Sequence, residues 1–394
     1  MSKFIFAVVS SQLVLSQLSN ILPPPAPLKY PSTDQSQMIS GDLLTDPLIT
    51  NALKYVESVV SPTILNIKVS TYQSGSTVTY NDNPANTCYW PNDLCVRSAE
   101  TTDYKKDVFV CPNANDWGLT YDDGPSVDPT AGTSQLLDSL NVSNNLKATF
   151  FIVGSNAVQF PDVLKKMHEN QHQLASHSWS HHPLTSLTNA QVVAEIKYTE
   201  SVIYNATGIV PSYFRPPYGD IDDRIRGILS ALGYHNILWT TTPPRDTQDA
   251  SSDTSPAKAA SIVQNVKDTF FPAQAGFISL QHDTNSFTVG VGISVLNEIT
   301  KAGPTFPLKV QPVGQCQGIT SAQWYQVAGS VVPPVNNSTT GATPGASTST
   351  VSGTTESTTG STITPGTTVN AKSSASKYNF GTVLFIISVI FTKF

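Results

Sequence analysis

Short apolar runs alternate with segments of helical periodicity from about residue 107 to about residue 310. Apolar residues recur with a helical period over residues 189–204 and again over 222–232, and Gly233 then provides a helix-ending signal. The short apolar runs that predict strands lie at residues 108–110, 118–121, 148–153, 174–176, 237–239 and 277–280. Strands and helices that alternate at this spacing favour an α/β fold with a parallel sheet or barrel. In barrels of this class the functional side chains lie at the carboxyl ends of the strands.

The regions on either side of this central part have a different composition. Residues 20–106 form an N-terminal extension, which begins with a stretch rich in Pro, Ser and Gln and contains a predicted helix at about 48–60. Residues 317–376 are assigned to a stalk rich in Ser and Thr, a composition that cannot bury enough apolar surface to pack a core. We therefore expect one enzyme-sized domain over residues 107–316, between the extension and a disordered stalk.

The two ends of the 394-residue chain are similar to targeting signals. Lys3 and the apolar run that follows it are typical of a secretory signal peptide, to which we assign residues 1–19. Residues 380–391 are apolar, but they are fewer than the roughly 20 that a membrane-spanning helix needs. Small residues and a polar spacer precede them, so residues 377–394 are interpreted as a glycosylphosphatidylinositol (GPI) attachment signal. The sequence thus predicts secretion, with a GPI anchor at the plasma membrane and/or in the cell wall.

The chain contains four cysteines, and an even number is typical of an oxidising compartment. Cys88 and Cys95 are close enough to staple a local loop, whereas Cys111 and Cys316 bracket the central domain. All three possible pairings remain open at this stage. Acceptor motifs for N-glycosylation, which agree with secretion, occur at Asn141, Asn205, Asn336 and Asn337.

Composition narrows the class of partner. Charged residues make up 13% of the chain and the formal net charge is −6, without a basic patch. This balance argues against nucleic acid as a partner and agrees with a neutral ligand such as a glycan.

Acids and histidines cluster after two of the predicted strands. Asp122 and Asp123 stand together before a Gly-Pro turn, and two adjacent carboxylates are costly unless a cation opposes them. His177 and His181 are four residues apart, a spacing that allows both imidazoles to share one metal ion. With Asp123 they form a ligand set of two histidines and one carboxylate that leaves positions open for water and substrate. Asp122 then remains free to act as a base.

Two further motifs carry chemistry. Arg215 precedes two prolines that stiffen its loop, and a rigid arginine can orient a buried carboxylate. His282 directly follows a predicted strand, which is a good position for a general acid.

Taken in order, the motifs at residues 120–125, 177–181, 215–218 and 280–282 resemble those of the NodB-type polysaccharide deacetylases, carbohydrate esterase family 4. The resemblance covers about half of the chain and implies a distorted (β/α) barrel with a divalent ion, zinc or cobalt. It also implies hydrolysis of N-acetyl groups on N-acetylglucosamine polymers, with chitin as the favoured substrate. The implied roles are a base for Asp122, metal ligands for Asp123, His177 and His181, an orienting residue for Arg215, an oxyanion donor for the Tyr218 N–H, a general acid for His282 and an acetyl-pocket wall for Leu280.

One motif departs from the family pattern. Members carry an Asp-x-x-Asp-Trp element, whereas this chain has Asp246 and Asp249 followed by Ala250. We expect Asp246 to be the partner of His282, and the missing tryptophan changes one wall of the site. Trp179, Tyr218 and Trp239 are candidate faces for sugar stacking, although core packing explains Trp239 equally well.

Several other functions use similar residues. An acetylxylan or peptidoglycan deacetylase would share the whole mechanism, and a catalytically impaired wall protein would bind glycan without reaction. A non-haem iron oxygenase also uses two histidines and one carboxylate, but the paired Asp122 and Asp123 and the β/α alternation count against it. We expect the protein to be a monomer.

Overall fold

The computed structural model describes residues 22–327. The signal peptide expected at 1–19, most of the expected stalk and the GPI signal expected at 377–394 lie outside the described residues. Within the described part, no helix combines the length and apolar character that crossing a membrane requires.

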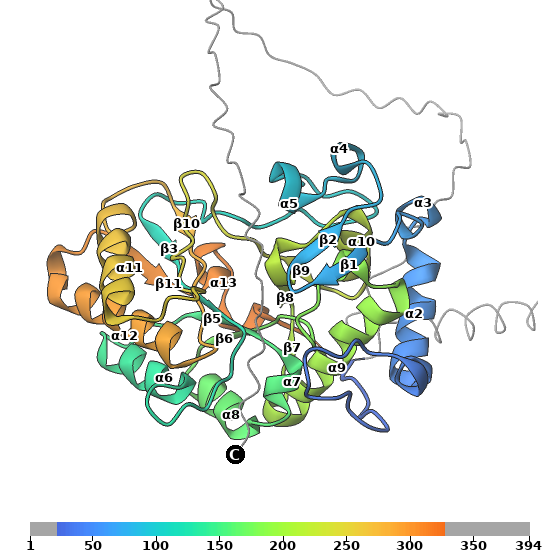
Figure 1. The fold of residues 1–394 in the computed structure, drawn as a ribbon, viewed down its shortest axis with the longest axis horizontal. Helices are drawn as coiled ribbons and strands as arrows, with labels where there is room; N and C mark the ends of the chain where they lie inside the picture. The colour runs from blue at the N-terminus through green and yellow to red at the C-terminus, as the bar shows by residue number, and fades with distance from the viewer. Residues whose placement is uncertain (1–21, 328–394) are drawn as a thin grey trace, which may run out of the picture. The chain divides into compact units, whose positions relative to one another are not determined.

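Two parallel sheets form the centre of the fold (Figure 1). The first has five strands, in the order β4 (Thr120–Asp122), β5 (Thr149–Ile152), β6 (Gln173–Ser176), β8 (Tyr213–Phe214) and β9 (His235–Asn236). The second has three strands, in the order β10 (Phe277–Ile278), β3 (Asp116–Gly118) and β11 (Lys309–Gln311).

The two sheets join into an irregular barrel. Strands β3 and β4 follow one another in the chain, and a parallel bridge pairs Asp122 with His282 beyond the end of β10. On the far side, the segment after β9 returns to β10, because the Thr240 N–H donates to the Ile278 carbonyl and Asp246 bridges to Leu280. The predicted distorted (β/α) barrel is therefore confirmed.

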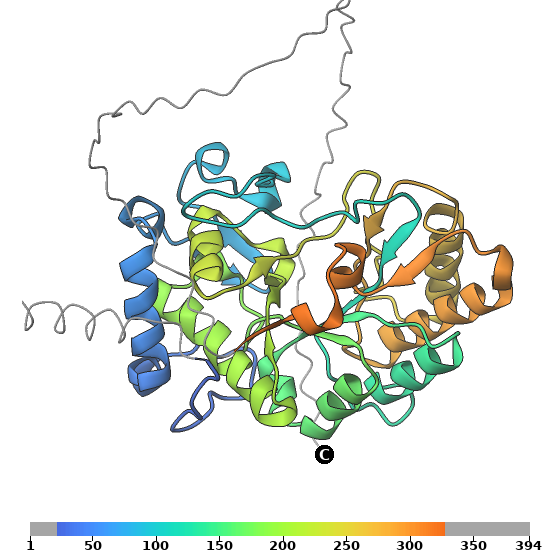
Figure 2. The same cartoon turned by 180° about the vertical axis from the view of Figure 1, so that it is seen from behind.

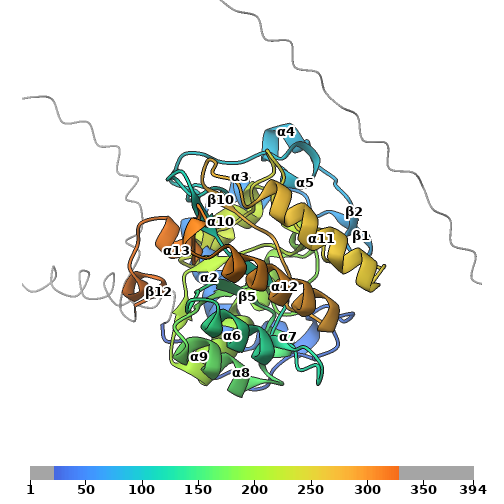
Figure 3. The same cartoon turned by 90° about the vertical axis from the view of Figure 1, so that its left-hand side faces the viewer.

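Helices cover the barrel because the central strands are buried on both faces. The predicted helices at 189–204 and 222–232 are present as α9 (Asn189–Thr207) and α10 (Asp223–Ala231), with Thr188 and Asp222 as N-caps. Figure 3 shows α6, α12 and α11 side by side on one face. The remaining helices of this part are α6 (Thr133–Val142), α7 (Gly154–Ala157), α8 (Pro161–Glu169), α11 (Pro256–Thr269), α12 (Ser286–Ala302) and α13 (Val313–Cys316), with the short 3-10 turns η2 (Leu184–Ser186), η3 (Pro217–Gly219) and η4 (Gly303–Thr305).

The N-terminal extension packs on the barrel and shares its core. The helix expected at 48–60 is α2 (Pro47–Val59), whose Ile49 and Val56 are fully buried in the same cluster as the barrel core. In Figure 1 this helix, in blue, lies beside α9 and α10, and the contacts between these helices agree. The other elements of the extension are η1 (Gly41–Thr45), α3 (Pro62–Leu65), β1 (Thr71–Ser74), β2 (Thr77–Thr79), α4 (Pro84–Thr87) and α5 (Trp90–Asp93).

The structure corrects the expected start of the stalk at residue 317. Residues 317–327 contain η5 (Ser321–Gln323) and β12 (Tyr325–Gln326), and β12 pairs antiparallel with β7 (Val210–Pro211). Figure 2 shows this last segment, in orange, crossing from α13 to the green part of the chain. Because Trp324 is buried, the fold continues to at least residue 327.

Two disulfides resolve the three open pairings. One joins Cys88 to Cys95 within the extension, and the other joins Cys111 to Cys316 across the domain. The cysteines of the second bond are separated by 205 residues, so this bond constrains the unfolded chain far more than the first, with a separation of 7.

Replacing Cys111 and Cys316 together by serine is expected to lower the free energy of unfolding by up to about 5 kcal/mol, from the loop-closure entropy of the unfolded chain. The matched control replaces Cys88 and Cys95 and is expected to lower it by roughly 2.5 kcal/mol. Denaturant-induced unfolding measures both values. Equal losses in the two double variants would contradict the entropic account.

Candidate metal and catalytic site

Three side chains meet at the carboxyl ends of neighbouring strands. Asp123 directly follows β4, His177 directly follows β6, and His181 lies four residues further on. The Asp123 Oδ1 atom is 3.3 Å from His177 Nε2 and 3.0 Å from His181 Nε2. Among the described residues, these three form a group whose ligand atoms all lie within 4.8 Å of one another. The structure thus brings together the predicted ligand set.

The hydrogen bonds of His177 test whether this group fits a cation. Its Nδ1 lies 2.6 Å from the backbone carbonyl oxygen of Arg215, which can only accept, so Nδ1 carries the proton. In the neutral ring Nε2 then presents a lone pair to the Asp123 carboxylate, and a cation between these two acceptors removes their repulsion. The separations of 3.0 and 3.3 Å are close to those between ligands that bind one zinc-sized ion tetrahedrally at about 2.0–2.1 Å. The residues therefore fit a divalent cation.

The backbone at these positions is strained. Asp123, Ser178, His181 and Tyr218 have positive φ values of 78°, 65°, 59° and 60°. Such conformations cost non-glycine residues of order 1–3 kcal/mol each and persist where surrounding contacts impose them. Asn156 supplies one such contact, because its side-chain amide donates to the Asp123 carbonyl at 2.8 Å.

The carboxylate of Asp122 is paired with the guanidinium of Arg215. Arg215 Nη1 donates to Asp122 Oδ1 at 2.7 Å and to the Thr120 hydroxyl at 2.8 Å. The Arg215 side chain is fully buried and its guanidinium lies over the Phe151 ring. The second carboxylate oxygen, Asp122 Oδ2, is 3.8 Å from His177 Nε2 and so faces the ligand group. One oxygen of Asp122 is thus held while the other is presented to the site.

The expected pairing of His282 with Asp246 is wrong. His282 Nδ1 lies 2.7 Å from Asp249 Oδ1, and the His282 backbone N–H donates to Asp249 Oδ2. Asp246 instead accepts from the backbone and side chain of Gln248. A parallel bridge places it beside Leu280, two residues before His282. Burial by itself lowers the pKa of His282, but the bond to Asp249 and the nearby acid charges outweigh it and raise that pKa to about 10.

Two buried acids that position the site carried no role in the sequence analysis. Asp283 accepts from the Gly124 N–H and the Thr133 hydroxyl, which fixes the loop that follows Asp123. Burial raises the pKa of Asp283 to about 7. Glu195 accepts from the backbone N–H groups of Trp179 and Ser180 and so holds the loop of residues 177–182, called the histidine loop below. Asp283 directly follows the motif at residues 280–282, whereas Glu195 lies in a predicted helix without any local signal.

The structure separates the candidate sugar-stacking residues. Trp179 is 0% exposed and stacks on Tyr30, so the expectation that it contacts sugar is wrong. Trp239 is half-buried and its ring packs edge-on against Trp90. Tyr218 is 40% exposed with its ring 4.6 Å from that of His181, and Leu280 is 7% exposed. Of the three aromatic candidates, Tyr218 is the one that presents a face beside the ligand group.

In the metal-free protein, Asp249→Asn is expected to lower the pKa of His282 by about two pH units, because the variant removes the negative charge that stabilises the imidazolium. Asp246→Asn is the matched control and is expected to change this pKa by less than about half a unit. Titration of the histidine ring protons by NMR measures both. A larger effect of the control would restore Asp246 as the partner.

Comparisons with known proteins show what this chain is similar to. The sequence profile of the family described as polysaccharide deacetylase matches residues 110–237. Chitin deacetylase 1 of Cryptococcus neoformans var. grubii is 36% identical over 248 residues, which cover 60% of this chain and 50% of that protein. The chitin deacetylase of Pestalotiopsis sp is 34% identical over 240 residues, which cover 60% of this chain and 75% of that protein. A solved structure of the chitin deacetylase from Colletotrichum lindemuthianum aligns with a TM-score of 0.49 at 28% identity, over 56% of this chain and 95% of that one.

The chain spans about half the length of the first curated relatives that it matches. The Pestalotiopsis protein, in contrast, is matched over three quarters of its length at more than 30% identity. The resemblance read from the four motifs is therefore confirmed, and the chain belongs to the polysaccharide deacetylase family.

Proposed function

We propose that this protein hydrolyses the N-acetyl groups of N-acetylglucosamine units in chitin and releases acetate. The observation that carries the proposal is that two adjacent acids have different partners. Asp123 faces His177 and His181, and the adjacent Asp122 is held by Arg215 with one oxygen free. This is the arrangement that a water-activating hydrolase needs.

We assign the divalent ion to Asp123, His177 and His181, with zinc or cobalt as the candidate metals. When bound, the ion would lower the pKa of water and polarise the acetyl carbonyl. Asp122 takes a proton from the attacking water, because its free oxygen faces the ligand group and Arg215 prevents it from rotating away. Arg215 therefore acts as a positioning residue for the base.

The remaining groups act on the two ends of the amide bond. The Tyr218 N–H donates to the oxygen that becomes negative as the carbonyl carbon is attacked, a type of contact typically worth about 3–4 kcal/mol. His282, kept protonated by Asp249, delivers its proton to the nitrogen as the C–N bond breaks. Leu280 forms a wall for the acetyl methyl group. The products are acetate and a glucosamine unit.

Chitin is preferred as substrate because the relatives named above are chitin deacetylases. Acetylated xylan and peptidoglycan remain the alternative substrates of the same chemistry. The impaired, glycan-binding alternative is weakened by the His282–Asp249 pair, which is intact although Ala250 stands where the family has tryptophan.

The location of the protein is part of the proposal. We propose a secreted monomer that is held at the plasma membrane or wall by a GPI anchor. Two disulfides support an oxidising compartment, and the glycosylation acceptors Asn141 and Asn205 are both exposed.

Asp122→Asn is expected to reduce acetate release from chitin oligomers by at least about 100-fold, because the amide cannot accept the water proton. The affinity for the oligomers is expected to stay within about threefold, as measured by calorimetry. Acetylated xylan and peptidoglycan, assayed in parallel with the unchanged protein, test the substrate. Undiminished acetate release by this variant would exclude the proposed base.

His177→Ala is expected to weaken zinc binding by at least about 100-fold, since even the loss of a ligand's hydrogen-bond partner typically costs 10- to 100-fold. His182→Ala, one residue beyond the ligand group, is the control and is expected to bind zinc within about threefold of the unchanged protein. Competition with a chromogenic chelator gives both affinities, and chelator treatment is expected to stop acetate release. Full activity in metal-free protein would overturn the assignment.

A further inference from the structure

A pocket of about 240 Å³ lies directly beside the ligand group, and the N-terminal extension builds half of it. Residues of the barrel that line it are Ser180, His181, His182 and Tyr218, and residues of the extension that line it are Gln35, Ser36, Tyr72 and Gly75. We propose that these extension residues form a binding wall for the sugar unit next to the one that loses its acetyl group. This inference rests on the proposed function and adds a specificity element from outside the barrel.

The first part of the wall is fastened close to the metal ligands. Tyr30 stacks on Trp179 with 5.5 Å between ring centroids, and the Trp179 indole N–H donates to the Ser32 carbonyl at 2.9 Å. Further on, Gln35 donates to the Ser155 hydroxyl at 3.1 Å and to Asn156 at 3.3 Å. Asn156 is the residue whose side chain holds the Asp123 carbonyl. Residues 30–36 are thus tied to the segments that position the site.

The second part of the wall is the hairpin of β1 and β2. At its base, the Ser70 N–H and hydroxyl both bond to Thr185, at 2.8 and 2.9 Å. Thr185 in turn donates its N–H to Asp220, two residues beyond Tyr218. The Tyr72 ring then lies 5.4 Å from that of His182. The hairpin therefore lies against the histidine loop.

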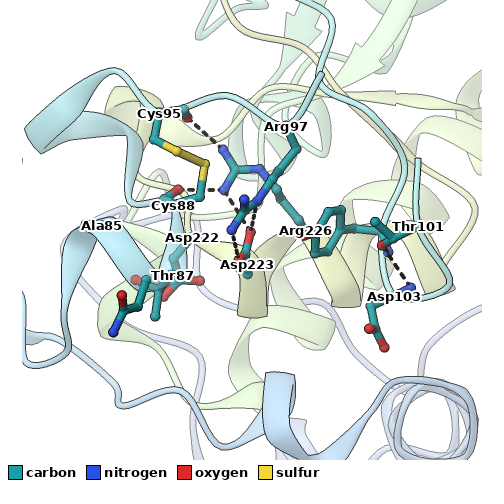
Figure 4. A network of polar contacts seen from close by, with 12 residues as sticks. Ala85, Thr87, Cys88, Cys95, Arg97, Thr101, Asp103, Asp222, Asp223 and Arg226 are labelled. Carbon is teal, nitrogen blue, oxygen red and sulfur yellow. Dashed lines mark hydrogen bonds and ion pairs between the residues drawn. A yellow bond between two sulfur atoms is a disulfide. The ribbon is translucent and has the colours of Figure 1, made fainter. Parts of the chain in front are cut away.

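The rest of the extension is also fastened to the barrel. In Figure 4, Arg97 pairs with Asp223, and Arg226 donates to the carbonyls of Cys88 and Cys95, which are joined by a disulfide. The Asp223 and Arg226 side chains belong to α10, so a buried network connects the extension to the barrel. A wall that is already ordered loses little conformational entropy when a ligand binds.

The same region supports the loop that carries Tyr218. The Trp90 ring occupies the space where a side chain on Gly219 would lie, and the backbone N–H of Trp90 donates to the Ile221 carbonyl. The Tyr89 hydroxyl donates to Asp220 at 3.0 Å. The extension therefore both lines the pocket and supports the loop from which Tyr218 lines it.

The chemistry of the lining suits a sugar. Tyr218 and Tyr72 offer aromatic faces, while Gln35 and Ser36 offer an amide and a hydroxyl for hydrogen bonds. The pocket volume corresponds to the space that about eight water molecules occupy in the liquid. A pocket of this size accommodates one sugar ring rather than a stretch of polymer. Substrates long enough to reach this pocket gain contacts that the shortest substrates lack.

The test compares Tyr72→Ala and Gln35→Ala with the unchanged full chain on N-acetylglucosamine and on its oligomers of two to six units. Tyr72→Ala is expected to raise KM for the oligomers roughly tenfold, with kcat within about twofold, and to leave KM for the single sugar, which has no neighbouring unit, unchanged. Gln35→Ala is expected to raise KM in the same pattern by about threefold. Gln73→Ala is the matched control, because Gln73 is exposed and bonds across the hairpin to Thr79, and its KM values are expected to stay unchanged.

The outcomes separate this inference from the proposed function. If the unchanged protein releases acetate but Tyr72→Ala and Gln35→Ala have its KM at every length, the binding wall is refuted and the function stands. If the unchanged protein releases no acetate, the function fails. Calorimetric binding of the hexamer then decides on the wall, which is refuted if Tyr72→Ala binds the hexamer as tightly as the unchanged protein.

Discussion

Asp122 and Asp123 are adjacent in the chain, and the whole site depends on giving their two negative charges different partners. Two unopposed carboxylates this close would repel one another at a cost in free energy. Asp122 keeps the strand conformation at the end of β4 and meets the guanidinium of Arg215, whereas the positive φ of Asp123 turns it toward the two histidines. The backbone change between the two residues therefore separates the proposed base from a proposed metal ligand.

Arg215 connects these two halves. Its side chain holds Asp122, while its backbone carbonyl accepts the Nδ1–H of His177 and so fixes which imidazole nitrogen faces the ligand group. Substitution of the side chain removes the first contact and leaves the second in place, because the carbonyl belongs to the main chain. Because Arg215 orients both the proposed base and a proposed ligand, the positions of the two depend on each other.

The extension enlarges this picture beyond the barrel. Its helix α2 shares the barrel core, its network around Arg97 and Arg226 holds α10, and its hairpin and residues 35–36 reach the pocket beside His181. Segments more than a hundred residues apart in the chain thus meet at the same site. The binding wall that we propose is a product of this packing.

The sequence by itself determined the class of fold and the chemical groups of the site. The periodicity over 189–204 and 222–232 is local, and so is the placement of Asp122, Asp123, His177, His181, Arg215 and His282 after apolar runs, which is why these predictions could be made. Local pattern could not say which acid of the pair Asp246 and Asp249 faces His282, nor that Trp179 is buried beneath Tyr30, nor that residues 317–327 complete the fold. Those outcomes depend on contacts between segments distant in the chain, whose energies arise only when the barrel closes and its surfaces pack. For the same physical reason the cysteine pairing, the role of Glu195 and the reach of the extension to the site were decided by the tertiary structure alone.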